Sequence, residues 1–245
     1  MNRLHTELDR LYLRGLVVAE GDAQAPSLVD ARDRVRALIL EVVQPAGWDA
    51  LSEVWHGVQM ELELPAPAIA VSGRDGLQLW FSLESSLPAG PAHAFLEALR
   101  SRFLPHVAAS RVRLWPTAAQ PARHAALVPA LQADTGNWSA FIAPDLVSIF
   151  SETPWLDVEP GEEGQSALLR GLESIKPAAF DAALAAMRAS APPVPAPASV
   201  VAVAGATPAP EDDPRRFLSR VMNDESVPLA LRIEAAKALL KPGAP

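Results

Sequence analysis

Two alternating apolar runs joined by a short glycine turn constrain the fold of this chain most. They occupy residues 68–83, AIAVSGRDGLQLWFSL. Because successive side chains of a strand point to opposite faces of a sheet, the pattern predicts a β-hairpin whose second strand is half-buried. Trp80 alternates with the leucines, so we expect it on the other face, covered by a helix or packed in a core.

The turn of this hairpin, residues 72–76, is the candidate binding site. Its two glycines permit positive φ and a close approach of a ligand to the backbone, and exposed turn amides can hold a phosphate. In the alternative interpretation the turn only connects the strands, and Arg74 and Asp75 form a solvated pair. The candidate nucleotide-binding residues are Ser72, Gly73, Arg74, Gly76 and Gln78.

The composition limits the chemistry of the chain. It contains no cysteine, and its five histidines are scattered without the paired spacing of metal ligands. Disulfides, thiolate nucleophiles and cysteine–zinc sites are therefore excluded, and we expect neither a metal site nor a cofactor. No Ser-His-Asp spacing, nucleophile elbow or Walker loop is present.

The charge argues against strong binding of nucleic acid. The net charge is −8, and residues 211–245 carry six basic and six acidic residues, so the whole excess lies upstream of them. A domain that binds a duplex needs a basic face, so we expect binding of a nucleotide or DNA to be weak at most. No apolar run reaches the ~18 residues of a membrane span, and no signal-type apolar core begins the sequence. These features predict a bacterial-type cytoplasmic protein that does not contact a membrane.

The sequence divides into three parts. Residues 1–189 mix helical and strand patterns and predict an α+β or α/β domain. Residues 190–210 contain no charge and many prolines, which predicts a disordered Pro/Ala-rich linker. Residues 211–245 predict a helical hairpin that docks on a partner or on a second copy, or folds back onto its own domain. Besides the hairpin, we expect helices over 1–16, 48–62, 92–104, 165–172 and 177–187, and strands over 34–43, 111–115 and 138–142.

This order of elements resembles the archaeo-eukaryotic primase superfamily, which includes the polymerase domains of bacterial end-joining ligases. The matching stretches are ALILEVVQPAGWDALSEVW, then AIAVSGRDGLQLWFSL followed by PAGPAHAFLEALRSRFLP, and WSAFIAPDL, which together span roughly residues 34 to 145. In that family an Asp-x-Asp pair ends the first strand, a Ser-Gly-x-x-Gly-x-His hairpin follows, and a later strand supplies one more aspartate. The resemblance therefore implies a primase-like fold, with a mixed sheet and flanking helices, for residues 1–189.

The family's functional positions are altered in this chain. Glu41 and Val43 stand where the aspartate pair would fall, and Gln78 corresponds to the histidine that contacts the nucleotide's phosphates. At the third position stands Ala143, with Asp145 two residues later. Because a two-metal mechanism needs several hard anionic oxygens close together, the resemblance implies a degenerate domain without catalytic residues.

The tail, DPRRFLSRVMNDESVPLALRIEAAKALLK, resembles helical segments of phage terminase small-subunit-like proteins. Together these features predict a noncatalytic accessory or adaptor protein with a nucleic-acid-associated role. Two alternatives stay open. One is an active metal-dependent nucleotidyltransferase with relocated carboxylates, for which Glu41, Asp145 and Asp157 would have to converge beside the 72–76 turn. The other is an interaction protein without any nucleic-acid role, which the acidic charge favours.

Overall fold

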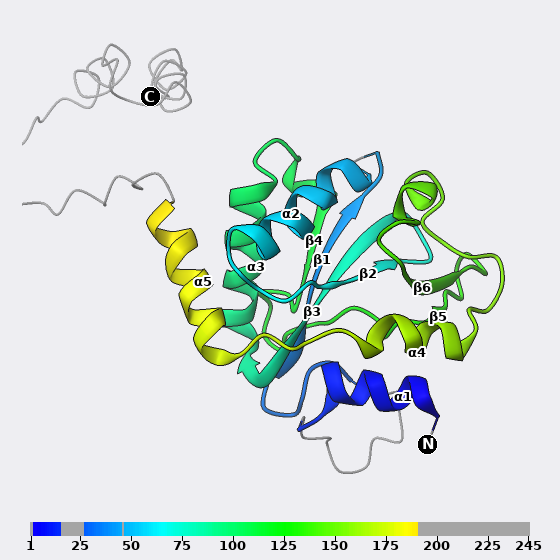
Figure 1. Cartoon of the computed structure of the whole chain (residues 1–245), viewed down its shortest axis with the longest axis horizontal. Coiled ribbons are helices and arrows are strands. Elements are labelled where there is room, and N and C mark those ends of the chain that lie inside the picture. Colours follow the sequence, from blue (N-terminus) through cyan, green and yellow to red (C-terminus); the bar gives the residue numbers. More distant parts are fainter. Residues whose placement is uncertain (1, 16–26, 46, 191–245) are drawn as a thin grey trace, which may run out of the picture. The chain divides into compact units, whose positions relative to one another are not determined.

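Six strands form one antiparallel sheet in the computed structural model, which describes residues 2–15, 27–45 and 47–190 (Figure 1). The sheet order is β4-β1-β3-β2-β6-β5, and every neighbouring pair runs antiparallel. The strands are β1 (Arg34–Val43), β2 (Ala68–Val71), β3 (Gly76–Pro88), β4 (Val112–Trp115), β5 (Ala130–Leu131) and β6 (Trp138–Ile142). The expected combination of helices and a sheet is confirmed as α+β.

The expected mixed sheet is wrong for the strands of the described part. Helix α2 (Trp48–Met60) connects β1 to β2, and these two strands do run in the same direction, as a helical crossover requires. They are not neighbours, however, because β3 lies between them and pairs with both. Because β3 inserts between the two parallel strands β1 and β2, each of them pairs with β3 in the antiparallel direction.

Helices cover both faces of the sheet. On the first face α2, α3 (Ala89–Phe103) and α5 (Pro177–Ser190) pack on one apolar cluster that includes Leu79. On the second face α1 (Arg3–Leu8), which continues as a π-helical turn over Asp9–Leu13, and α4 (Glu162–Arg170) pack on another cluster that includes Trp80. No helix of the described ranges is long and apolar enough to cross a membrane.

Residues 76–83 of strand β3 are buried on both faces rather than half-buried. Leu79 and Trp80, which point in opposite directions, are both 0% exposed. Trp80 meets the rings of Tyr12 and Phe141 edge-on, at centroid distances of 5.2 and 5.7 Å, so its predicted placement opposite the leucines is confirmed. The N-terminal helix supplies the second cover that the hairpin pattern alone did not reveal.

Most predicted elements are confirmed, and two coincide with the observed strands β1 and β6. Strand β5 was missed because its two residues are too few to carry an alternating pattern. Two short 3₁₀ segments, Ala109–Arg111 and Val147–Phe150, lie in connections. The predicted linker, apart from Ser190 at the end of α5, and the predicted hairpin of residues 211–245 lie outside the described residues.

The packing of α2 against α3 can be tested at Gly57. A Cβ atom there would lie 2.3 Å from Cε1 of Phe103, whereas a Cβ at Gly164 in α4 would meet nothing within 4 Å. Replacing a helical glycine by alanine ordinarily stabilises by about 0.5–1 kcal/mol. We expect Gly57→Ala instead to lower the free energy of unfolding by about 1–3 kcal/mol, because overpacking outweighs the propensity gain. Gly164→Ala is the matched control and should not destabilise. Urea unfolding of both variants measures the difference, and a stabilised Gly57→Ala would contradict the packing described here.

Candidate functional site

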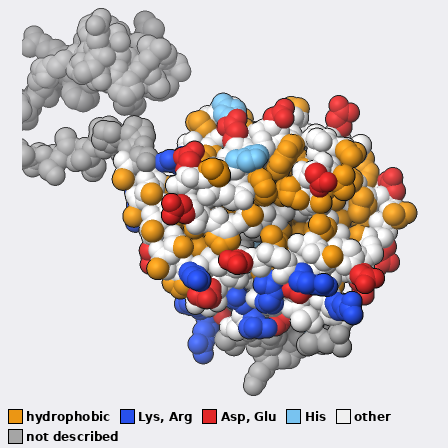
Figure 2. Space-filling model, viewed as in Figure 1, with side chains coloured by type: hydrophobic (Ala, Val, Ile, Leu, Met, Phe, Trp, Pro, Cys, Tyr) orange, Lys and Arg blue, Asp and Glu red, His pale blue; other side chains and the backbone are white. Residues whose placement is uncertain are grey.

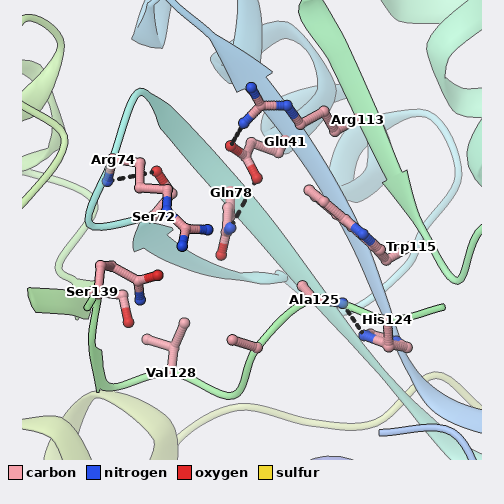
Figure 3. Close-up of a pocket in the computed structure, with 12 residues that line it drawn as sticks. Glu41, Ser72, Arg74, Gln78, Arg113, Trp115, His124, Ala125, Val128 and Ser139 are labelled. Carbon is pink, nitrogen blue, oxygen red and sulfur yellow. Dashed lines mark hydrogen bonds and ion pairs between the residues drawn. The ribbon is translucent and has the colours of Figure 1, made fainter. Parts of the chain in front are cut away.

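Three polar side chains form a row across neighbouring strands on the second face of the sheet (Figure 3). Glu41 on β1 lies directly opposite Gln78 on β3 and directly opposite Arg113 on β4. Residues that are directly opposite in a sheet point to the same face, so their side chains can interact. The register therefore brings together residues that are 37 and 72 positions apart in the sequence.

Glu41 is a buried carboxylate with both oxygens engaged. Its side chain is 2% exposed. Gln78 donates from Nε2 to Oε2 at 3.0 Å, and Arg113 donates from a terminal nitrogen to Oε1 at 3.0 Å. Burial raises the pKa of Glu41, while the hydrogen bond from Gln78 and the charge of Arg113 act in the opposite direction. Trp80 donates to Oε1 of Gln78 at 2.8 Å, which fixes the orientation of the amide.

Arg113 also holds a second carboxylate, that of Asp75 in the 72–76 turn. Two guanidinium nitrogens donate to the two carboxylate oxygens of Asp75 at 2.8 and 2.9 Å. The hydrogen bond to Asp75 is the largest cause of a raised pKa of Arg113, so the guanidinium is firmly charged. A single cation is thus shared between a buried carboxylate on one side and a half-exposed one on the other.

Three amides of the 72–76 turn donate hydrogen bonds to acceptors within the protein, which corrects the expectation of exposed amides. The hydroxyl of Ser72 accepts from the amides of Arg74 at 3.2 Å and Gly76 at 3.0 Å. The amide of Gly73 donates to the carbonyl of Pro154 at 3.0 Å. These three amides are therefore not available to cradle a phosphate.

The two glycines of the turn serve different purposes. Gly73 has φ of +77°, in the left-handed region that glycine tolerates best. Gly76 does not use this freedom, because its φ is not positive. A Cβ at Gly76 would lie 2.4 Å from Oε1 of Glu41. Gly76 therefore makes room for the buried carboxylate.

Arg74 and Asp75 do not pair with each other as a solvated turn pair. Arg74 donates to both carboxylate oxygens of Asp134, from Nε at 3.0 Å and from a terminal nitrogen at 2.9 Å. The hydrogen bond from Arg74 is the largest cause of a lowered pKa of Asp134. Thr135 donates its hydroxyl to the carbonyl of Gly73 at 3.1 Å. The turn is thus joined to the turn between β5 and β6.

A cavity of about 200 Å³ lies beside this network. Of the predicted site residues, Ser72, Arg74 and Gln78 line it, and Figure 3 shows the Gln78 side chain in the middle of the lining. The sequence analysis named Glu41 as an altered metal position and as a possible relocated metal ligand, and it did not propose the remaining lining residues as a site. These are Arg113, Trp115, His124, Ala125, Ala126, Val128, Gln132 and Ser139. Only the alternation of β4, which places Arg113 and Trp115 on one face, could have indicated two of them.

His124 is held neutral in the wall of the cavity. Its Nδ1 accepts from the amide of Ala125 at 2.9 Å, so Nε2 carries the proton and faces the carbonyl of Ala37 at 3.0 Å. Burial lowers the pKa of His124 to about 4. The ring therefore fixes the segment 121–128 to β1 and adds no positive charge at neutral pH.

No three acidic or histidine side chains among the described residues are grouped to hold a metal ion. Glu41, Asp145 and Asp157 accordingly do not form the convergent set that relocated metal ligands would require. A scan against protein-family models gave no match, and neither did a search of the curated proteins.

The fit between Gly76 and Glu41 generates one prediction. Gly76→Ala would force the Glu41 side chain away from Gln78 and Arg113, because the new Cβ cannot share its space. We expect a loss of about 2–4 kcal/mol in the free energy of unfolding, from overpacking and from a disturbed buried charge. Gly161→Ala, at an exposed glycine with negative φ and open space around its Cβ position, provides a comparison without the overpacking. Equal losses in the two variants, measured by urea unfolding, would contradict the role given to Gly76.

His124 makes the stability of the domain depend on pH. Its folded pKa of about 4 lies below the ordinary value of 6.5, so the unfolded chain binds the proton more readily between these pH values. Stability should therefore be lost as the pH falls from 6.5 toward 4. Between pH 7 and pH 4.5 the wild type should lose about 2.5 kcal/mol more than His124→Gln, which keeps an amide donor for Ala37. The same slope of unfolding free energy against pH in both proteins would show that His124 is not the titrating group.

Proposed function

We propose that this chain is a noncatalytic, primase-like accessory or adaptor protein. It binds a nucleotide or single-stranded nucleic acid weakly, through the cavity beside the 72–76 turn. One observation carries the proposal: two arginines, Arg74 and Arg113, line the same small polar cavity as the indole of Trp115. One guanidinium group can donate two hydrogen bonds to two oxygens of a phosphate, and an indole offers a surface on which a base can stack.

The state of Glu41 supports a noncatalytic role. In two-metal phosphoryl transfer, carboxylates must be free to coordinate cations. Both oxygens of Glu41 already accept hydrogen bonds, and the positive charge of Arg113 compensates the negative charge of Glu41. A guanidinium has no coordination sites and cannot activate a hydroxyl, so it compensates the charge without supplying the chemistry.

The size of the cavity and the surface charge limit the ligand. A volume of about 200 Å³ is smaller than the ~300–1,000 Å³ of sites that enclose drug-sized molecules, so only part of a nucleotide fits inside. On the face drawn in Figure 2, basic side chains gather along the lower edge, while acidic ones are spread over the rest. That face lacks the continuous basic surface that duplex binding needs, which favours a short single strand or a free nucleotide.

The adaptor part of the proposal concerns residues 211–245. Their sequence pattern is that of an amphipathic hairpin, and a short helical unit on a Pro/Ala-rich linker suits docking on a protein partner or on a second copy. The net charge of −8 favours a second candidate, an interaction protein without any nucleic-acid role. A binding experiment separates the two.

The test is a titration of the full chain with dTTP and with a twelve-nucleotide oligo-dT at low salt, followed by tryptophan fluorescence. We expect binding that Arg74→Ala weakens about 3- to 10-fold, because a charge-assisted contact to phosphate is lost. Arg111→Ala is the matched control, since Arg111 is exposed and does not line the cavity. Absence of binding, or equal weakening by both substitutions, would leave only the interaction protein. Incorporation of nucleotides that Glu41→Gln abolishes would overturn the noncatalytic role.

A further inference from the structure

Each arginine of the cavity is already clamped by a carboxylate of the protein. Arg74 donates from Nε and a terminal nitrogen to the two oxygens of Asp134, and Arg113 donates from both terminal nitrogens to the two oxygens of Asp75. Both pairs are bidentate, which is also the geometry in which a guanidinium holds a phosphate. Asp75 and Asp134 therefore occupy guanidinium N–H donors that could otherwise bind an anionic ligand.

The two clamps differ from the buried contact between Arg113 and Glu41. The side chains of Asp75 and Asp134 are 46% and 57% exposed, whereas that of Glu41 is 2% exposed. Exposed ion pairs contribute little free energy and are screened by salt, so either aspartate can exchange its arginine for water at small cost. Glu41 cannot do so, because its charge would be left buried without compensation.

The clamps also connect the cavity to its surrounding turns. Asp75 belongs to the 72–76 turn, and its carbonyl accepts from the amide of Gln44 at 2.9 Å. Asp134 belongs to the turn between β5 and β6, which Thr135 joins to Gly73. These backbone contacts do not involve the carboxylates. Loss of the contacts between the carboxylates and the arginines would therefore leave both of these contacts intact.

We propose that Asp75 and Asp134 are internal competitors that occupy the anion site of this cavity, and that an anionic ligand binds by displacing them from Arg113 and Arg74. This inference rests on the proposed function, because it concerns the same cavity. It specifies the ligand class further: an anion with at least two phosphoryl groups, whose paired oxygens replace two separate carboxylates.

The proposal predicts that neutralising either competitor tightens anion binding. The probe is inorganic tripolyphosphate, titrated calorimetrically into the full chain in metal-free buffer at low salt. Asp75→Asn and Asp134→Asn should each tighten binding about two- to fivefold, the range that the loss of one exposed ion pair supports. The double variant should approach the product of the two effects, since the clamps share no partner.

Glu152→Gln is the matched control. Glu152 is exposed in the loop next to the 72–76 turn, and removing its charge changes the net charge by the same amount as each test variant. It should change the affinity by less than about 1.5-fold, because exposed charges at a distance are screened. Thermal unfolding of each variant verifies that the fold is intact, and the two aspartates are tested separately so that one remains informative if the other destabilises.

The outcomes separate the two proposals. Tighter binding in both aspartate variants but not in Glu152→Gln supports the inference. Binding that Arg74→Ala weakens, but that the aspartate variants change no more than the control, overturns the inference and leaves the proposed function standing. No binding by any variant, including the double one, overturns both.

Discussion

The compensation of one buried negative charge organises this molecule's candidate site. Glu41 lies in the middle of a sheet, with the backbone of Gly76 beneath its side chain, and is stable there only because Gln78 and Arg113 approach from the two neighbouring strands. Removing one partner of such a buried pair is costly, whereas the complete set is neutral or weakly favourable. Three features fit this arrangement of Glu41 between its two partners. They are the register of β1 with β3 and β4, the glycine at position 76 and the position of the 72–76 turn.

The cavity exists because the two faces of the sheet are covered differently. On the first face three helices pack tightly on an apolar cluster. On the second face α1 and α4 cover the cluster around Trp80, while the cavity beside the β4–β1–β3 row is walled by the irregular segment 121–128. A loop leaves polar side chains and water-sized gaps where a helix would close-pack apolar ones. His124 anchors this loop to β1, so the wall is fixed although it has no regular structure.

The sequence identified the regular elements well because their patterns are local. Strand β1 and helix α2 follow from runs of ten and thirteen residues with clear periodicity, and the β2–β3 hairpin follows from alternation around a glycine turn. It identified three of the twelve residues that line the cavity for the same reason: Ser72, Arg74 and Gln78 are close together in the chain. Only the alternation of the short strand β4 could have indicated Trp115, and His124 lies in an irregular segment whose pattern carries no signal. The antiparallel sheet was missed because strand order depends on which strand inserts between two others.

By itself, the sequence determined the hairpin, the absence of thiol chemistry and the acidic charge. Only the tertiary structure decided what Glu41 does, because Arg113 reaches it from a strand 72 residues away. It likewise decided that Arg74 and Asp75, adjacent in sequence, pair with different partners. The physical reason is the same in each case. Local periodicity specifies which way a side chain points, but only the pairing of distant strands brings opposite charges within hydrogen-bonding distance.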